Sequence, residues 1–453
     1  MNSSTAWVRM DIQFLTIEVG STITKANGFQ LLPEGRFEHL AQGFAPTSVT
    51  DGDVRIGVEE AVRQLQEQSG QFTHVPQMFL NSSAAGGLRM TVHGLTYNMT
   101  ARAAREAALG AGAIIKKITA GLLEPDDLEE IQAIHPNIIL LAGGVDYGEK
   151  NTVLQNARLL SGLQLGAPVI YAGNTSIRSQ IQAIFGGAGI ELFLAANVFP
   201  EVDVLNIEPV RRIIQEVFNR HIIHAPGMQH IAELTQHEIL PTPGAVLRGA
   251  ELFAESMGDC LVLDVGGATT DVHSVTDGSP EWNALSVEPE PHAKRTVEGD
   301  LGVFINARNI VDLEPDPQRR PQLSDLQAIP HTDDEIALVH WLCEKAVNIA
   351  VRRHAAVVAD SYTPTGRKKL VKGKDLTAVK WIIGTGGALT RVEGGEQILQ
   401  DIRTGAGKYL LPTADARILM DRNYLFSALG TLAQEYPQEV KATFEHWIQS
   451  EEA

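Results

Sequence analysis

Two ten-residue segments that lie far apart in the chain follow one pattern. IEVGSTITKA (residues 17–26) and LDVGGATTDV (residues 263–272) share an apolar residue, an acid, an apolar residue, glycine, a small residue and hydroxyl residues. Each predicts a buried strand with a carboxylate near its end, a glycine turn and a returning strand. Double glycines also follow predicted strands in LAGGVD (141–146) and GTGGAL (384–389). This alternation of loops indicates an internal duplication.

Helical patterns lie between these strands, notably at residues 101–113, 251–257 and 335–351. Strands that alternate with helices predict an α/β architecture. The chain changes character at the Pro- and Gly-containing joint 241–244 (PTPG). We therefore predict two related lobes. The first covers residues 10–240 and holds the first acid–glycine loop and an inserted α/β segment, and the second covers residues 241–453.

Composition restricts the possible partners and the compartment. The 453 residues carry a formal net charge of −18, which repels nucleic acid, so no nucleic-acid partner is expected. The two cysteines, Cys260 and Cys343, lack metal-ligand spacing, and this favours a reducing compartment. Apolar runs are too short to span a bilayer, and the first residues do not resemble a secretory signal. A cytoplasmic protein without a membrane partner is the expectation.

The second acid–glycine loop carries the strongest chemical signal. Asp264 ends the predicted strand, and Gly266 and Gly267 permit a tight turn in which backbone N–H groups approach a ligand. A carboxylate at this place can hold Mg²⁺ or orient a water molecule. The residues expected to contact phosphate on the returning side are Thr269, Thr270 and Asp271. The alternative is a hairpin whose aspartate only caps the turn.

The first acid–glycine loop repeats this arrangement with Glu18 as the acid. Gly20, Ser21 and Thr22 form the turn, so loop N–H groups and hydroxyls are placed to donate to phosphates. Lys25 adds a positive charge, although the same pattern suits a solvated strand residue. Alone the turn is a weak signal, and its similarity to the Asp264 loop strengthens the interpretation.

The third loop, WIIGTGGALTR (381–391), runs from a strand through Gly384, Gly386 and Gly387 to a helix that is expected from Ala388. Glycines at these positions allow an adenine or ribose to lie against the backbone. No Gly-Lys-Ser/Thr follows, so this is not a Walker A loop, and it is not a GxGxxG dinucleotide fingerprint. A simple strand-to-helix turn is the alternative.

The order of the three loops resembles that of the phosphate-1, phosphate-2 and adenosine motifs of the actin-like ATPase superfamily. The chain is further similar to the MutL-type family associated with glutamate mutase, which is unrelated to the mismatch-repair protein of that name. The segments that carry this resemblance are NSSAAGGLRMTVHGLT (81–96), TARAAREAALGAGA (100–113), LLAGGVDYGEK (140–150), YAGN (171–174), NVFP (197–200) and RTVEGDLG (295–302).

The resemblance implies a two-lobed actin-like fold that closes over ATP and Mg²⁺. Asp264 and Glu18 would be the catalytic and metal-holding carboxylates, with slow hydrolysis in the absence of a partner. The family implies a chaperone-like role as a reactivating factor for an adenosylcobalamin-dependent mutase such as glutamate mutase. Glu18 departs from the aspartate that is usual in the superfamily, which lengthens the side chain by one carbon and bears on the rate of hydrolysis.

Two other functions stay open at this stage. A small-molecule kinase would use the same nucleotide site and would need a base near the γ-phosphate, for which Asp146 and Asp271 are candidates. A non-catalytic nucleotide-binding scaffold is compatible with the glutamate at position 18.

Overall fold

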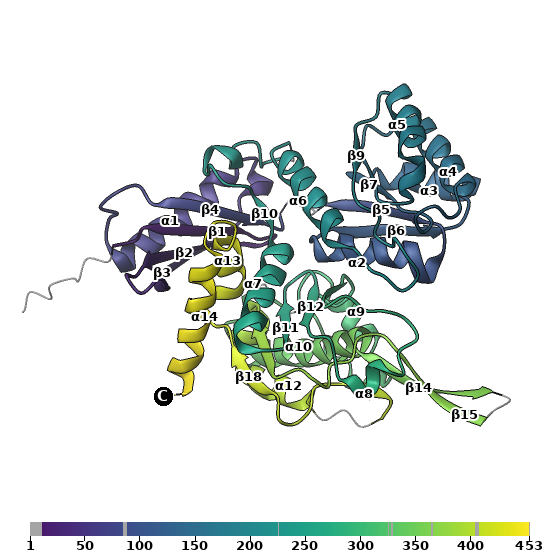
Figure 1. The fold of residues 1–453 in the computed structure, drawn as a ribbon. Helices are drawn as coiled ribbons and strands as arrows, with labels where there is room; N and C mark the ends of the chain where they lie inside the picture. Colours follow the sequence, from purple (N-terminus) through teal and green to yellow (C-terminus); the bar gives the residue numbers. More distant parts are fainter. Residues whose placement is uncertain are drawn as a thin grey trace, which may run out of the picture.

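The structure is a computed structural model that describes residues 11–84, 88–224, 226–324, 326–327, 329–363, 366–403 and 407–452. These residues form three five-stranded sheets and one three-stranded sheet, with helices between the strands (Figure 1). The predicted α/β architecture is confirmed.

The first sheet contains the first acid–glycine loop, and its strand order is β10-β4-β1-β2-β3. Its strands are β1 (Phe14–Val19), β2 (Ile23–Leu31), β3 (Phe37–Pro46), β4 (Gln77–Ser82) and β10 (Leu240–Pro241). Strand β2 is antiparallel to β1 and β3, whereas β4 is parallel to β1 and to β10. Helix α1 (Val54–Ser69) begins at the Asp53 cap and packs on β2 and β3 through its apolar face.

The second sheet contains the other two loops and repeats this topology in the order β13-β12-β11-β16-β18. Its strands are β11 (Cys260–Val265), β12 (Thr270–Val275), β13 (Ala293–Glu298), β16 (Trp381–Thr385) and β18 (Arg417–Met420). The antiparallel and parallel pairings fall in the same places as in the first sheet. Two sheets of one topology in one chain confirm the two-lobed actin-like fold and agree with the expected internal duplication.

The third sheet is inserted after β4 and is parallel throughout, in the order β6-β5-β7-β8-β9. Its strands are β5 (Arg89–Gly94), β6 (Ile114–Ala120), β7 (Ile138–Leu141), β8 (Val169–Tyr171) and β9 (Leu192–Leu194). Its helices are α2 (Arg102–Gly110), α3 (Pro125–Ile134), α4 (Asn151–Gly162) and α5 (Arg178–Gly187). In Figure 1 it stands beside the first sheet, on the far side of α6 (Glu208–Ile222).

The inserted sheet corrects one detail of the duplication. The double glycine of LAGGVD follows β7, which belongs to the inserted sheet and not to the duplicated unit. The strand equivalent to β16 in the first lobe is β4, which ends at Ser82. Residues 85–87, with the glycine pair that follows β4, lie outside the described part of the chain.

The remaining elements cover the second sheet and extend from it. The helices are α8 (Pro280–Asn283), α9 (Ala307–Asp312), α10 (Asp333–His354), α11 (Gly387–Thr390) and α12 (Gly395–Asp401). The small sheet consists of β14 (Ala356–Thr363), β15 (Gly366–Lys372) and β17 (Tyr409–Leu410). The long helix α10 begins with a capping box between Thr332 and Glu335, as the helical pattern of residues 335–351 predicts.

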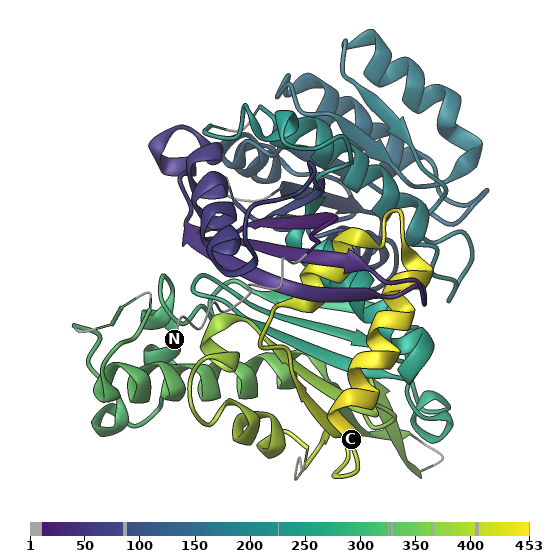
Figure 2. The same ribbon diagram turned by 90° about the vertical axis from the view of Figure 1, so that its left-hand side faces the viewer.

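Three helices join the two lobes: α7 (Thr242–Met257), α13 (Leu425–Leu432) and α14 (Pro437–Glu452). Helix α13 packs against β1 and β4, and α7 packs against β11 and β12. One core cluster therefore contains Phe79 of the first sheet, Phe253 of α7 and Val262 of the second sheet. Figure 2 shows α13 and α14 in yellow beside the two sheets. The division near residue 240 stays a prediction.

Helices α7 and α13 approach each other at a pair of glycines. A Cβ at Gly430 would collide with the carbonyl oxygen of Ala245, and one at Gly249 would lie 2.6 Å from that of Phe426. We expect Gly430→Val to destabilise the protein by about 2 kcal/mol or more, because neither helix backbone yields easily. Denaturant unfolding measures this. Gly186→Val is the control, since nothing lies within 4 Å of its Cβ, and equal losses in both variants would contradict the close crossing.

Candidate functional site

The loop between β11 and β12 is held by a neighbouring segment of the second lobe. Backbone N–H groups of residues 303–305 donate to this loop: Val303 to the Gly266 carbonyl, and Phe304 and Ile305 to that of Gly267, at 2.7–3.1 Å. The side-chain amide of Asn306 donates to the Ala268 carbonyl at 2.7 Å. Three successive carbonyl groups of the loop are therefore turned toward residues 303–306.

This arrangement decides where the loop N–H groups point. Because C=O and N–H of a trans peptide point in opposite directions, the N–H groups of Gly267, Ala268 and Thr269 face away from residues 303–306. None of these three groups donates to another residue in the described part of the chain. Successive outward N–H groups form a concave site for an anion, and this is the geometry that a phosphate requires.

In the equivalent loop of the first lobe, two carbonyl groups accept hydrogen bonds from Thr47, which follows β3. Its hydroxyl donates to the Gly20 carbonyl at 2.9 Å, and its N–H donates to the Thr22 carbonyl at 2.9 Å. The hydroxyl of Ser21 donates to Ser83 at 3.2 Å, and the side chains of Ser21 and Thr22 are exposed. The turn is therefore rigid at its backbone and accessible at its hydroxyl groups.

Glu18 is neutralised by a lysine on the neighbouring strand. Lys25 lies opposite it in the register of β1 and β2, with Nζ 2.6 Å from Oε1, and the hydroxyl of Ser427 donates to Oε2 at 2.5 Å. Burial alone would lower the pKa of Lys25, but the Glu18 carboxylate reverses the shift and raises it. The ammonium also lies 4.0 Å from the centre of the Tyr424 ring. Lys25 is thus charged and held in place.

Asp264 has no such partner. No described residue donates a hydrogen bond to its carboxylate, which keeps partial exposure to solvent. Burial raises the pKa of this carboxyl to about 7, and the ammonium of Lys25 limits the rise. Three nearby carboxylates raise the pKa of Asp264 as well: Asp271, Glu18 and Asp421. A carboxyl with a pKa near neutrality and no bonded partner is suited to proton transfer or to cation binding.

The polar residues after the second loop are engaged inside the protein. The hydroxyl of Thr270 is buried and donates to the Leu301 carbonyl at 2.7 Å. Asp271 forms a buried ion pair with Arg295 at 2.5 Å. The hydroxyl of Thr269, which is partly exposed, donates to Asp271 at 3.2 Å. In this conformation only Thr269 of this trio lies where a ligand can reach it, and the phosphate role of the other two stays a prediction.

The third loop lies directly beside Asp264. Asp264 pairs with Thr385 in the parallel register of β11 and β16, and a Cβ at Gly386 would lie 2.7 Å from the Asp264 carboxylate. Gly386 has a φ of +87°, which favours glycine there. Helix α11 begins at Gly387, one residue before the expected start at Ala388, with Gly387 exposed and Ala388 partly exposed. Gly384 is buried under Leu389 and supports the loop from behind.

Contacts between the lobes lie next to this loop. Arg391, just after α11, has its guanidinium 5.6 Å from the ring centres of both Phe44 and Tyr424. Gln42 of β3 accepts a hydrogen bond from Arg391 and donates to the Asn423 carbonyl at 2.8 Å. The two lobes therefore meet in the part of the molecule where the acid–glycine loops and the third loop lie.

Asp264 and Glu18 differ in how well their carboxylates could bind Mg²⁺. Mg²⁺ in proteins is usually held by one or two carboxylates together with water and substrate phosphates. Asp264 fits this role because its oxygens have no bonded partner, whereas both oxygens of Glu18 are engaged by Lys25 and Ser427. Among the described residues, no group of three or more His, Cys, Asp or Glu side chains is arranged as metal ligands.

Several residues at the site were missed by sequence reasoning. Asp421 follows β18, is fully buried, and accepts hydrogen bonds from Leu425 and Phe426 at the start of α13. Burial raises its pKa to about 6. Asp421 could have been predicted, because it is an acid directly after an apolar strand. Thr47 and Ser427 could not, because only the tertiary fold brings them to the site.

Comparisons with known proteins place the chain in a family. The model of the MutL protein family matches residues 14–448. Protein MutL of Clostridium tetanomorphum is 35% identical over 460 residues, covering 94% of this chain and 97% of that protein. The chain therefore belongs to the MutL protein family, as its motifs predict.

Solved structures show only a distant likeness. A glycerol dehydratase reactivase has a TM-score of 0.34 at 11% identity, covering 93% of this chain and 99% of the other. The xylulose kinase of Bifidobacterium adolescentis has a TM-score of 0.31 at 12% identity, covering 95% and 94%. Scores of this size carry no functional information. Within the described residues, no helix has the length and apolar character needed to cross a membrane.

The raised pKa of Asp264 predicts a pH-dependent effect on stability. A carboxyl whose pKa rises on folding, here to about 7, lowers the free energy of unfolding as pH increases from about 4 to 7. Asp264→Asn removes this titration, so we expect it to raise the Tm at pH 8 and to leave it near the wild-type value at pH 4. Asp415→Asn, at an exposed position, is the control. An equal Tm shift at both pH values would contradict the perturbed carboxyl.

Proposed function

We propose that the protein binds ATP between the two acid–glycine loops and hydrolyses it slowly. One observation carries this proposal: the N–H groups of Gly267, Ala268 and Thr269 point away from the segment that holds their loop, beside the unpartnered carboxylate of Asp264. The equivalent loop at Gly20 belongs to the first lobe, so phosphates bound by both loops would connect the lobes.

Each group has a defined task in this proposal. The loop N–H groups and the hydroxyls of Ser21, Thr22 and Thr269 bind phosphate oxygens. Asp264 orients the attacking water, either directly or as a ligand of bound Mg²⁺. Bound Mg²⁺ would neutralise phosphate charge, with Asp264 as its protein ligand. Glu18 acts indirectly: it fixes the ammonium of Lys25, whose charge lowers the pKa of Asp264.

The candidate bases for a small-molecule kinase are engaged elsewhere. Asp146 lies in the inserted unit, where it accepts hydrogen bonds from the Thr175 N–H at 2.8 Å and from Asn197 at 3.0 Å. Asp271 is bound to Arg295 in a buried ion pair. Neither carboxylate is available as a base in this conformation, and this favours water over a second substrate as the acceptor.

The biological role that we infer is chaperone-like. The protein would use ATP to open an adenosylcobalamin-dependent mutase such as glutamate mutase and release damaged cofactor. Membership of the MutL family and the two-lobed fold support this role. A surface that spans two lobes changes shape when the nucleotide between them changes, so partner affinity is coupled to hydrolysis.

Nucleotide binding is tested by thermal shift. ATP with Mg²⁺ should raise the Tm of the wild type, because a ligand that binds only the folded state stabilises it. Gly387→Leu should abolish the shift while the protein stays folded, since Gly387 is exposed and its φ is not positive. Asp264→Asn should keep the shift and lose about 100-fold in phosphate release. An unchanged Tm shift in Gly387→Leu would contradict the assignment of this loop to adenosine. A phosphorylated small molecule formed without release of phosphate would favour a kinase.

The partner role is tested with the cobalamin-dependent mutase of the same host. Inactivated holoenzyme is mixed with this protein, free adenosylcobalamin and ATP, ADP or no nucleotide, and the absorbance of enzyme-bound cobalamin is followed. We expect ATP to accelerate cofactor exchange and Asp264→Asn to slow it, because the work depends on a nucleotide cycle. Equal exchange rates with all three additions would refute the reactivation role and leave ATP binding untouched.

A further inference from the structure

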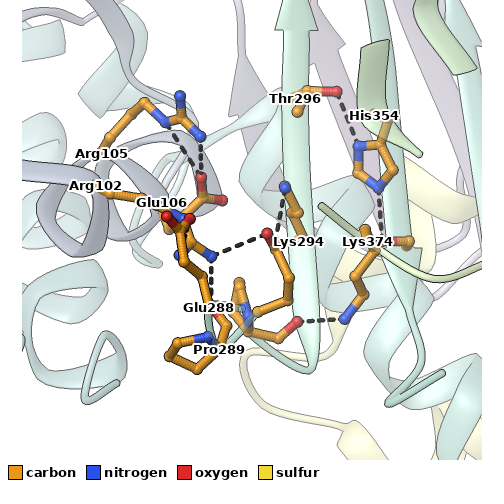
Figure 3. Close-up of polar contacts among 12 residues, drawn as sticks. Arg102, Arg105, Glu106, Glu288, Pro289, Lys294, Thr296, His354 and Lys374 are labelled. Carbon is orange, nitrogen blue, oxygen red and sulfur yellow. Dashed lines mark hydrogen bonds and ion pairs between the residues drawn. The ribbon is translucent and has the colours of Figure 1, made fainter. Parts of the chain in front are cut away.

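A second candidate site lies between the inserted unit and the second lobe, outside the nucleotide loops. It is a cavity of about 540 Å³ beside the start of α2, bounded across from it by β13, β14, β15 and the end of α10. None of the residues of the three glycine loops lines it. Figure 3 shows its polar centre, where Arg102 and Arg105 of α2 face Lys294 of β13.

The lining of the cavity carries more cations than carboxylates, in a chain of net charge −18. Six cationic side chains line it: Arg102, Arg105, Lys294, Arg352, Arg353 and Lys372. Two described carboxylates line it as well, Glu288 and Glu290, and three more, Glu106, Glu298 and Asp300, pair with its arginines from outside the lining. Cations gathered in a concave site concentrate the positive potential there and attract anions against the general field of the protein.

Four of the six cations already have partners. Arg102 is paired with Glu288 and Glu290 at 2.9 Å each, and Lys294 with Glu290 at 2.7 Å (Figure 3). These pairs hold α2 of the inserted unit against the segment before β13.

The other two partnered cations line the cavity beside this pair of carboxylates. Arg105 is paired with the buried carboxylate of Glu106 at 2.6 Å, and Arg353 is paired with Glu298 and Asp300. Both bonds of Arg105 to Glu106 use Nε and one terminal nitrogen, so the other terminal nitrogen is available. Arg105 can therefore contact a ligand without losing its partner.

Arg352 and Lys372 have no carboxylate at all. Both side chains are exposed into the cavity, and within the described residues neither forms an ion pair or a side-chain hydrogen bond. The only interaction of the Arg352 side chain in that part of the chain is with the Tyr409 ring, whose centre lies 5.9 Å away. Two unneutralised cations from different elements, beside a partly free guanidinium, form a site for an anion with several oxygens.

The cavity also has walls that suit an organic body. Two tyrosines line it, Tyr97, which is 59% exposed, and Tyr409, together with Ile118, Ile349 and Val357. A bare phosphate would fill only part of 540 Å³. Ligand sites of this size usually combine such apolar walls with a few polar anchors.

We propose that this cavity binds a phosphorylated small molecule, with Arg352, Lys372 and Arg105 on the phosphate and the two tyrosines against its organic part. The ligand would bridge α2 of the inserted unit and the β14–β15 hairpin of the second lobe. Because it contacts both parts, it stabilises their present arrangement and acts separately from the nucleotide loops.

Pyrophosphate is the probe for the anion subsite, and isothermal titration calorimetry measures its affinity. Lys372→Glu should weaken binding at least about tenfold, because it replaces an unpaired cation at the site by a like charge. Lys368→Glu is the matched control: it makes the same charge change on the same exposed strand but outside the cavity. It should change affinity less than about twofold. Equal effects of the two substitutions, or none, would overturn the proposal.

Two further measurements separate this site from other sources of binding. Lys372→Glu should keep the Tm shift caused by ATP, so loss of pyrophosphate binding with ATP binding intact distinguishes this site from the nucleotide loops. Pyrophosphate bound at those loops would be insensitive to Lys372→Glu, which would count against the cavity. Citrate, a polycarboxylate, should bind at least about tenfold more weakly than pyrophosphate, and equal binding of citrate would overturn the assignment to phosphate.

Discussion

The candidate site is organised around one partly buried lysine among carboxylates. Lys25 pairs with Glu18, which also binds Ser427 of α13, and its charge acts on Asp264 in the other lobe. Without this cation the carboxylates would repel one another in a desolvated setting, and the pKa values of Asp264 and Asp421 would rise further. The pair lies on β1 and β2, bonds to α13 and acts on Asp264 of β11, so the acid–glycine loops of both lobes depend on one charge.

Much of the fold can be predicted from the sequence because its signals are local. A segment of ten residues is enough to recognise a short apolar strand followed by a glycine turn. Strands β1, β11 and β16 lie where those patterns predict them. The capping box at Thr332 likewise marks the start of α10. The comparison of LAGGVD with GTGGAL fails because a double glycine after a strand occurs in any α/β unit, including the inserted one.

The support of the site could not be predicted, since it comes from distant residues. Residues 303–306 donate hydrogen bonds to the carbonyl groups of the second loop, and Thr47 donates to those of the first. Neither segment has a sequence motif that indicates this role. The pairing of Glu18 with Lys25 follows from strand register, which becomes certain only once the turn length is known. Sequence patterns therefore locate the loops, and tertiary contacts decide which of their atoms remain available.

The two lobes differ in the residue that faces the acid of each hairpin. In the register of each hairpin the acid faces the residue seven positions later: Glu18 faces Lys25, and Asp264 faces Asp271. In the first lobe this neighbour neutralises the acid. In the second lobe it is a carboxylate that Arg295 has already bound, so it leaves Asp264 unpaired and raises its pKa. Within one shared hairpin geometry, the acid of the first lobe is bound by its neighbours, whereas the acid of the second lobe has no bonded partner among the described residues.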